Sequence, residues 1–214
     1  MNLIRVKPTT DFTITGEGDN QNWQKAEWLK MTKIEGSADY ATKCKILYSE
    51  TGIYVLIDCE DNKLNCTFEK DFEHLFVEDV VEVFLQPKQD RALYFEYELS
   101  PLNYELPILI PNIDGIFHGW LPWHYDGDRK VKHATSVRGG DCAPGASVSG
   151  WTAEMFIPYA LLVAIGTPAK KGDVWRGNVY RIDTDESPES KWALEPDVGG
   201  NFHNYKKFSE LIFE

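Results

Sequence analysis

Acidic side chains are the most abundant groups in this sequence that could do acid–base chemistry, and several of them fall on neighbouring predicted strands. Glu78, Asp79 and Glu82 lie in one apolar stretch, and Glu96 and Glu98 lie in the next. Hydrolysis of a glycosidic bond needs two carboxyl groups held about 5–10 Å apart across that bond. Paired acids with perturbed pKa values are the exception among protein carboxylates. A structural role is therefore the favoured interpretation of these acids, and a catalytic role is the alternative.

The signatures of other catalytic chemistries are absent from the sequence. Residues 145–150 do not have the G-x-S-x-G spacing of a nucleophile elbow. There is no phosphate-binding Walker loop, no G-x-G-x-x-G after a strand and no H-E-x-x-H. The histidines are scattered, and we interpret His118 and His203 as structural residues because neither has a partner at ligand spacing. We expect a protein that is not an enzyme.

Oxygen-bearing side chains gather at three places where predicted strands end. The clusters are 58–62, 126–128 and 183–186, and aspartate dominates each of them. Calcium takes six to eight oxygen ligands, often from such loops. None of the clusters has EF-hand spacing, and charge clusters of this kind also occur as solvated turns. A structural calcium ion is one prediction, and a solvated turn is the alternative.

Aromatic residues are concentrated in one proline-rich region, residues 100–130, which we expect to be a long loop. Trp120 and Trp123 lie in this region, and Trp192 lies in another loop-like stretch. Aromatic side chains in loops often contact a ligand or partner. The other tryptophans (Trp23, Trp28, Trp151 and Trp175) flank strand patterns, so we expect them in the core.

The charge balance restricts the class of partner. The chain has 22 basic and 34 acidic residues, a net charge of −12, and a sequence pI near 4.9. This balance excludes a nucleic-acid binder, which needs a basic face, and disfavours an anionic membrane surface. Neither a membrane-spanning run nor a signal peptide is recognisable, so we expect a cytoplasmic protein, or a secreted or periplasmic one whose leader has been removed.

The four cysteines do not form a recognisable metal or disulfide pattern. Cys44, Cys59, Cys66 and Cys142 lack C-x-x-C spacing. Free, partly buried thiols are the favoured interpretation. A bridge between Cys44 and Cys59 is the alternative, since both fall on strands that are predicted to pair.

The positions of these residues depend on short strands, because the dominant hydrophobic period is two. In residues 93–99, Phe95 and Tyr97 point to one face while Glu96 and Glu98 point to the other. Strands are predicted at 44–48, 53–58, 79–85, 93–99, 131–137, 151–157, 174–182 and 209–213, and one short helical turn at 158–165. We predict an all-β, antiparallel two-sheet β-sandwich of the immunoglobulin or jelly-roll kind, with at most one or two short helices. Residues 1–214 form a single domain in this prediction, and we expect a monomer.

Five short motifs occur in the order found in family 9 carbohydrate-binding modules, and the sequence resembles that family from about residue 12 to the end. The motifs are T-G-E-G-D at 15–19 followed by Trp23, Ala26 and Trp28, the hairpin at 45–56, E-D-V-V-E-V-F-L at 78–85, G-W-T-A-E at 150–154 with Ile157 and Pro158, and the tail at 202–213. The resemblance implies a calcium-supported sandwich that grips a sugar between two aromatic rings. It also implies association with xylan- or cellulose-degrading glycoside hydrolases and carbohydrate catabolism.

The resemblance also implies positions for the ligand site. Phe76 and Phe202 stand where the family has its two stacking tryptophans, and Glu82 stands where it has an acid that binds hydroxyl groups. Glu96 replaces a basic residue of the family. Phenylalanine has a smaller face than indole and no N–H donor, so weaker stacking is expected. The candidate ligand-binding residues are Phe76, Glu82, Glu96, Trp120, Trp123, Trp192 and Phe202.

Three alternative functions remain open at this point. A haem-binding sandwich of the related DOMON class would use Met31 or Met155 with a histidine as axial ligands. A glycoside hydrolase or lyase would use Glu82 and Glu96. An accessory protein with a decayed sugar site would instead mediate protein contacts.

Overall fold

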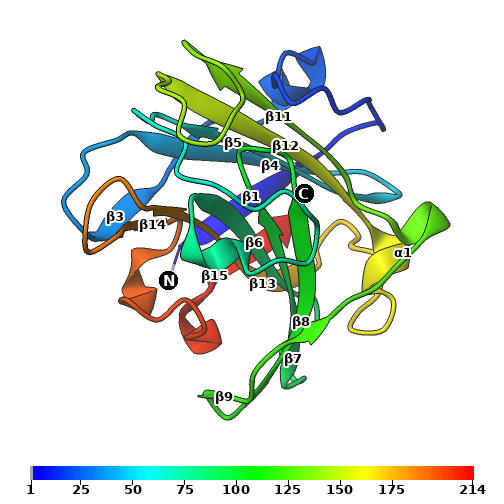
Figure 1. The fold of residues 1–214 in the computed structure, drawn as a ribbon. Helices are drawn as coiled ribbons and strands as arrows, with labels where there is room; N and C mark the ends of the chain where they lie inside the picture. The colour runs from blue at the N-terminus through cyan, green and yellow to red at the C-terminus, as the bar shows by residue number, and fades with distance from the viewer. Residues whose placement is uncertain (1) are drawn as a thin grey trace.

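The computed structural model describes residues 2–214 and has two β-sheets that pack face to face, with loops covering the outer face of the first (Figure 1). The first sheet has the order β10 (Leu121–Pro122), β8 (Glu105–Ile113), β7 (Leu93–Leu99), β6 (Val80–Gln86), β13 (Val174–Asp183), β15 (Ser209–Phe213) and β1 (Leu3–Pro8). In addition, β14 (Ser190–Ala193) pairs with β13 and with β3 (Thr32–Glu35), and β9 (Ile116–Phe117) pairs with β8.

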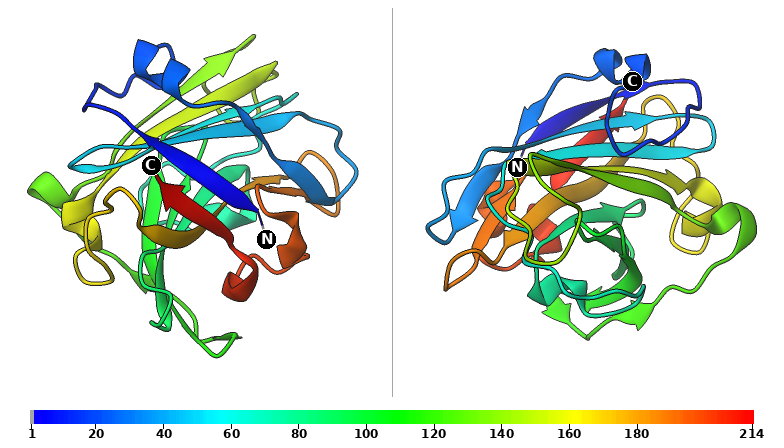
Figure 2. Two further views of the ribbon diagram at one scale, coloured as in Figure 1. Left: turned by 180° about the vertical axis from the view of Figure 1, so that it is seen from behind. Right: turned by 45° about the horizontal axis from the view of Figure 1, so that its top comes forward.

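The second sheet continues from the same first strand. Its order is β1, β4 (Thr42–Tyr48), β5 (Gly52–Cys59), β12 (Gly150–Pro158) and β11 (Lys132–Arg138), and β2 (Leu29–Lys30) pairs with β4. The beginning of β1 pairs in parallel with β15, and its end pairs in parallel with β4, so β1 joins the two sheets. Figure 2 shows β1 and β15 side by side, which places the two ends of the chain on neighbouring strands. The other pairings are antiparallel, and the predicted sandwich is confirmed.

Helical structure is limited to short turns. The single α-helix of the described residues, α1 (Tyr159–Leu162), follows Pro158, as predicted. Five 3₁₀ turns are η1 (Gln21–Lys25), η2 (Leu75–Val77), η3 (Gly127–Arg129), η4 (Pro196–Val198) and η5 (Tyr205–Lys207). Within residues 2–214, no helix has the length and apolar character needed to cross a membrane.

Strand alternation divides the apolar side chains into an inner core and two outer clusters. Phe95 and Tyr97 of β7, like Met155 of β12, point between the sheets and belong to the largest cluster. Tyr94 of β7 and Phe84 of β6 point to the outer face of the first sheet, where a second cluster forms beneath the loops. A third cluster covers the outer face of β5 and β12. The first sheet is therefore buried on both faces.

The region at 100–130 is not one long loop, as the sequence predicted, because it contains the nine-residue strand β8. Pro107 and Pro111 argued against a strand, since proline has no N–H for the ladder. The strand tolerates them because beyond it lie only the two-residue strands β9 and β10. The Pro107 carbonyl still accepts a hydrogen bond from the Trp123 N–H, at 2.8 Å.

Two tryptophan predictions were wrong, and three were confirmed. Trp23, Trp151 and Trp175 are buried. Trp28 is 41% exposed, and the Lys43 ammonium lies 4.5 Å from its ring centroid. Trp192, predicted in a loop, is buried on β14 with the Arg181 guanidinium 4.9 Å from its ring.

All four cysteines are free thiols, three of them buried, so the predicted free thiols are confirmed and no Cys44–Cys59 bridge forms.

Candidate functional site

A pocket of about 390 Å³ opens on the outer face of the first sheet. Its aromatic walls come from loops: Phe76 from η2, Trp120 and Phe117 from the segment around β9, and Phe202 from the segment before η5. Its base comes from the sheet, where Glu82 and Glu96 lie among isoleucines of β8 and β13. The pocket therefore combines apolar rings with two buried carboxyl groups at its base.

The register of three central strands sets the positions of the acids. Glu82 of β6 lies opposite Tyr180 of β13 on one side and opposite Glu98 of β7 on the other. Glu96 is two residues before Glu98 and therefore shares its face. Glu82 is 2% exposed and Glu96 is 4% exposed, and Glu98, opposite Glu82, is fully buried. The sheet thus holds three carboxyl groups together beneath the outer face.

The aromatic walls are braced by further rings. Phe202 stacks on Tyr180 with centroids 4.0 Å apart and an interplanar angle of 10°, and the Tyr180 hydroxyl donates to the Phe202 carbonyl at 2.9 Å. Phe117 stacks on His203 at 4.3 Å. Phe76 meets the edge of Trp120 at 6.5 Å. Because one face of Phe202 rests on Tyr180, only the opposite face of this ring is left for a ligand.

Burial controls the protonation of the pocket groups. It raises the pKa of Glu82 to about 8. Burial, reinforced by the neighbouring Glu82 carboxyl, raises the pKa values of Glu96 and Glu98 well above their ordinary range. Burial also lowers the pKa of His203 to about 4, and its Nδ1 lies 2.7 Å from the Tyr94 hydroxyl. At neutral pH, His203 is therefore uncharged and cannot neutralise the acids.

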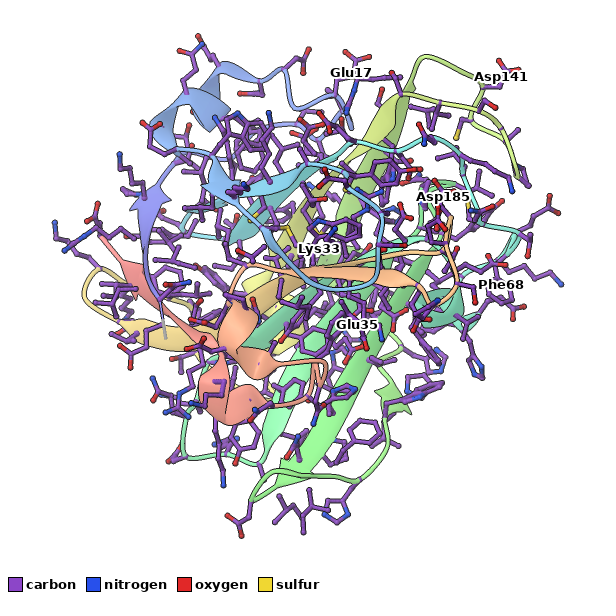
Figure 3. All side chains as sticks on the ribbon, turned by 90° about the vertical axis from the view of Figure 1, so that its left-hand side faces the viewer. Glu17, Lys33, Glu35, Phe68, Asp141 and Asp185 are labelled. Carbon is purple, nitrogen blue, oxygen red and sulfur yellow. The ribbon has the colours of Figure 1, made fainter. Side chains whose placement is uncertain are left out.

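The nearest lysine of the pocket is already engaged. Lys191 lines the rim, and its ammonium lies 2.8 Å from Glu35 and 3.0 Å from Glu189. Glu35 is the last residue of β3 and is labelled in Figure 3. The Lys191 ammonium therefore bonds to two exposed acids, and its charge lowers the pKa of Glu82 by less than burial raises it.

Five of the seven predicted ligand-binding residues line this one pocket: Phe76, Glu82, Glu96, Trp120 and Phe202. The other two do not. Trp123 packs against the inner core and donates its indole N–H to the Leu161 carbonyl at 3.2 Å, while Trp192 is buried on β14. That the five residues bind a ligand stays a prediction.

Sequence reasoning missed Phe117, His203 and Lys191, which also line the pocket. His203 had been interpreted as a structural histidine rather than as a pocket residue. No sequence signal marked Phe117 or Lys191, because each reaches the pocket through a pairing that only the folded sheet defines.

A second polar centre lies where β5 and β13 end and β6 begins. Asp61, Asp183 and Asp185 each offer a carboxylate oxygen, and these atoms lie within 4.8 Å of one another. Asp185 lies in the loop between β13 and β14 (Figure 3). The fold therefore joins the predicted cluster at 58–62 with the one at 183–186. The third predicted cluster lies apart from them, and there Asp126 pairs with Arg129 at 3.0 Å.

The donor chemistry of this aspartate centre fits calcium. Arg181, fully buried, donates to Asp61 at 3.0 Å and to Asp183. Asp79, also buried, accepts from the Thr184 N–H at 2.8 Å. The four aspartates Asp61, Asp79, Asp183 and Asp185 thus outnumber one guanidinium, and burial raises the pKa of Asp79 to about 7. An oxygen-only donor set with surplus negative charge is the kind that calcium prefers.

The methionines proposed as haem ligands lie elsewhere. Met31 and Met155 are buried in the inner core, on the opposite side of the first sheet from the pocket. The haem alternative is therefore not favoured.

Comparison with known proteins confirms the resemblance seen in the sequence. Residues 14–106, somewhat under half of the chain, match the family model described as "Carbohydrate family 9 binding domain-like". A search of curated proteins found no match.

Solved structures of similar fold extend over essentially the whole chain. A putative carbohydrate-binding protein from Bacteroides uniformis ATCC 8492 has a TM-score of 0.79 at 16% identity, covering 100% of this chain and 99% of that one. A family 9 carbohydrate-binding module from Caldicellulosiruptor kristjanssonii in complex with cellotriose has a TM-score of 0.72 at 19% identity, with coverages of 100% and 94%. The same source in complex with glucose gives 0.69 at 19% identity, with coverages of 98% and 95%.

Proposed function

We propose that this chain is a non-catalytic carbohydrate-binding protein or module, and that the pocket on the outer face of the first sheet receives the sugar. The observation that supports this most directly is the placement of Phe76, Trp120 and Phe202 around Glu82 and Glu96. A sugar ring presents a C–H face that packs on aromatic rings and hydroxyl groups that bond to carboxyl oxygens. The neighbours solved with cellotriose and glucose support the same class of ligand.

Isothermal titration calorimetry against glucose, cello-oligosaccharides and xylo-oligosaccharides tests the proposal. We expect saturable binding that weakens in Phe76→Ala and Phe202→Ala. The matched control is Phe68→Ala, since Phe68 packs against the same outer cluster without lining the pocket. Flat titrations at millimolar sugar with all ligands would contradict the proposal.

The absence of catalysis is part of the same proposal and has its own test. A hydrolase that used Glu82 and Glu96 would release reducing ends from cellulose or xylan, and Glu82→Gln would abolish the release. We expect no product above the no-protein background. Product release that disappears in this variant would identify an enzyme.

We further propose that the aspartate centre binds a structural calcium ion through Asp61, Asp183 and Asp185. A ligand that binds the folded state at 100 times its dissociation constant adds about 2.7 kcal/mol of stability. We therefore expect calcium to raise the melting temperature by several degrees over chelator-treated protein. Asp185→Asn should reduce this shift, and an equal shift in the variant would argue against the site.

A further inference from the structure

The base of the pocket carries three acids with no cation of the described residues committed to them. Glu82, Glu96 and Glu98 share one face of β6 and β7 and are at least 96% buried. Among residues 2–214, Glu96 Oε2 has no hydrogen-bond partner. Lys191 is held by Glu35 and Glu189. Buried carboxyl groups of this kind require protons or a cationic ligand.

Protons meet this requirement in the protein alone. Burial, together with the neighbouring carboxyl groups, raises the pKa values of both Glu96 and Glu98 well above their ordinary range, so both carry protons at neutral pH. The raised pKa of Glu82, which results from burial, keeps it largely protonated at pH 7 as well. A neutral sugar leaves this arrangement unchanged, whereas a cation would replace a proton and form a charge-assisted hydrogen bond.

The walls favour an organic cation over a metal ion. Phe76, Phe117, Trp120 and Phe202 surround the acids with apolar faces. Such rings pack on the C–H face of a sugar and also attract a cation placed over them. A divalent metal would instead need several oxygen donors, whereas only Glu82 and Glu96 place carboxyl groups at the base of the pocket, and the third pocket carboxyl, Glu189, pairs with Lys191.

We propose that this pocket prefers a saccharide with a free ammonium group, an amino sugar such as glucosamine or a de-N-acetylated glycan, with the ammonium placed on Glu82 and Glu96. This inference rests on the proposed carbohydrate-binding function and specifies its ligand class. The sugar ring would pack on Phe202 and Phe76, and the ammonium would reach the acids of the central strands. Acetylation of the nitrogen removes its charge and should remove the preference.

Isothermal titration with three matched ligands, glucose, glucosamine and N-acetylglucosamine, tests the inference at pH 7. Charge-assisted hydrogen bonds are about twice as strong as neutral ones, and the release of a proton from the acids offsets part of this gain, so we expect glucosamine to bind up to about tenfold tighter than the other two. Glu82→Gln and Glu96→Gln replace a protonated acid by a neutral group of the same shape, and each should reduce this ratio. Glu210→Gln, the same substitution outside the pocket, should leave the ratio unchanged.

The ratio should also depend on pH. The groups that face Glu82 are Glu96, Glu98 and Tyr94 of β7, Tyr180 of β13, Lys191 of β14, and His203 and Glu189 of the wall. Between pH 6 and pH 7 the acids must release a proton to receive the ammonium, while His203 stays neutral and Lys191 stays charged. The preference for glucosamine should therefore rise by up to about tenfold over this unit, with glucose affinity constant.

The possible results separate the two proposals. Equal affinities for glucosamine and glucose, or a preference that survives both glutamine variants, would overturn the amino-sugar inference and leave carbohydrate binding intact. No binding of any sugar would refute both. Thermal melts of each variant establish that it is folded before its titration is interpreted.

Discussion

Removal of the Phe202 ring tests the proposed stacking wall most directly. The ring stacks on Tyr180 at 4.0 Å and 10°, so one of its faces is occupied and the other is available to a sugar. A favourable ring contact contributes about 0.5–1.5 kcal/mol beyond the area it buries. Phe202→Ala should therefore weaken sugar binding about 2- to 12-fold. The same change should cost a similar free energy of unfolding, because the Tyr180 contact is lost as well.

The assay is calorimetric titration of wild type, Phe202→Ala, Phe202→Trp and Phe68→Ala with the best sugar found for wild type. Indole offers a wider face, so Phe202→Trp should bind at least as tightly as wild type. Phe68→Ala removes a ring from the same outer cluster but not from the pocket, and its affinity should be unchanged. Unchanged affinity in folded Phe202→Ala, or an equal loss in Phe68→Ala, would refute the assignment of Phe202 as a stacking residue.

Three further predictions concern buried charges. Glu154 is fully buried and accepts hydrogen bonds from the Trp23 indole N–H at 2.7 Å and from two backbone N–H groups. Glu154→Gln should therefore lower the free energy of unfolding, measured by urea denaturation, by about 2–4 kcal/mol. A loss under about 0.5 kcal/mol would contradict this role. Arg181→Met leaves the Asp183 carboxylate without its buried partner. The free energy of unfolding, measured by chemical denaturation at pH 7, should therefore fall by about 3–5 kcal/mol. A stability equal to that of wild type would show that the ion pair is not needed. The pKa of Glu82 in the folded protein, about 8, lies above its ordinary value of 4.5, so the stabilising effect of its proton is full below pH 4.5 and is lost as pH rises through 8. The melting temperature of Glu82→Gln relative to wild type should therefore increase from pH 5 to pH 8. A difference that stays constant over this range would exclude the titration.

The strand pattern was predictable because it depends on local alternation. Residues 93–99 and 151–157 place apolar side chains at every second position, and each set points into the inner core as expected. The prediction failed for β8, where Pro107 and Pro111 break the usual pattern of a strand. β8 tolerates two prolines because only the two-residue strands β9 and β10 pair with its outer side, and that property belongs to the sheet rather than to the segment.

The pocket residues were predictable in part. Phe76, Glu82 and Phe202 were found through ordered motifs, and the structure brings them to one pocket from η2, β6 and the segment before η5. Trp192 was misplaced because its sequence surroundings are rich in proline and acid, while its burial follows from pairing of β14 with β13 and β3. Trp28 was misplaced for the opposite reason, since an apolar ring beside a strand can cover lysine stems at the surface.

The sequence by itself determined the all-β class and the alternation of side chains along each strand. It also determined that acids lie on the face of β7 that carries Glu96. All three depend only on side-chain type and a period of two residues. Only the tertiary structure decided which acids meet. Glu82 and Glu96 come together because β6 pairs with β7 in one register, and Asp61 meets Asp183 because β5 and β13 end at the same place in different sheets. A shift of one residue in the pairing of β6 with β7 would turn one of the two glutamates to the other face, so the pocket and its charges depend on long-range contacts that no local pattern encodes.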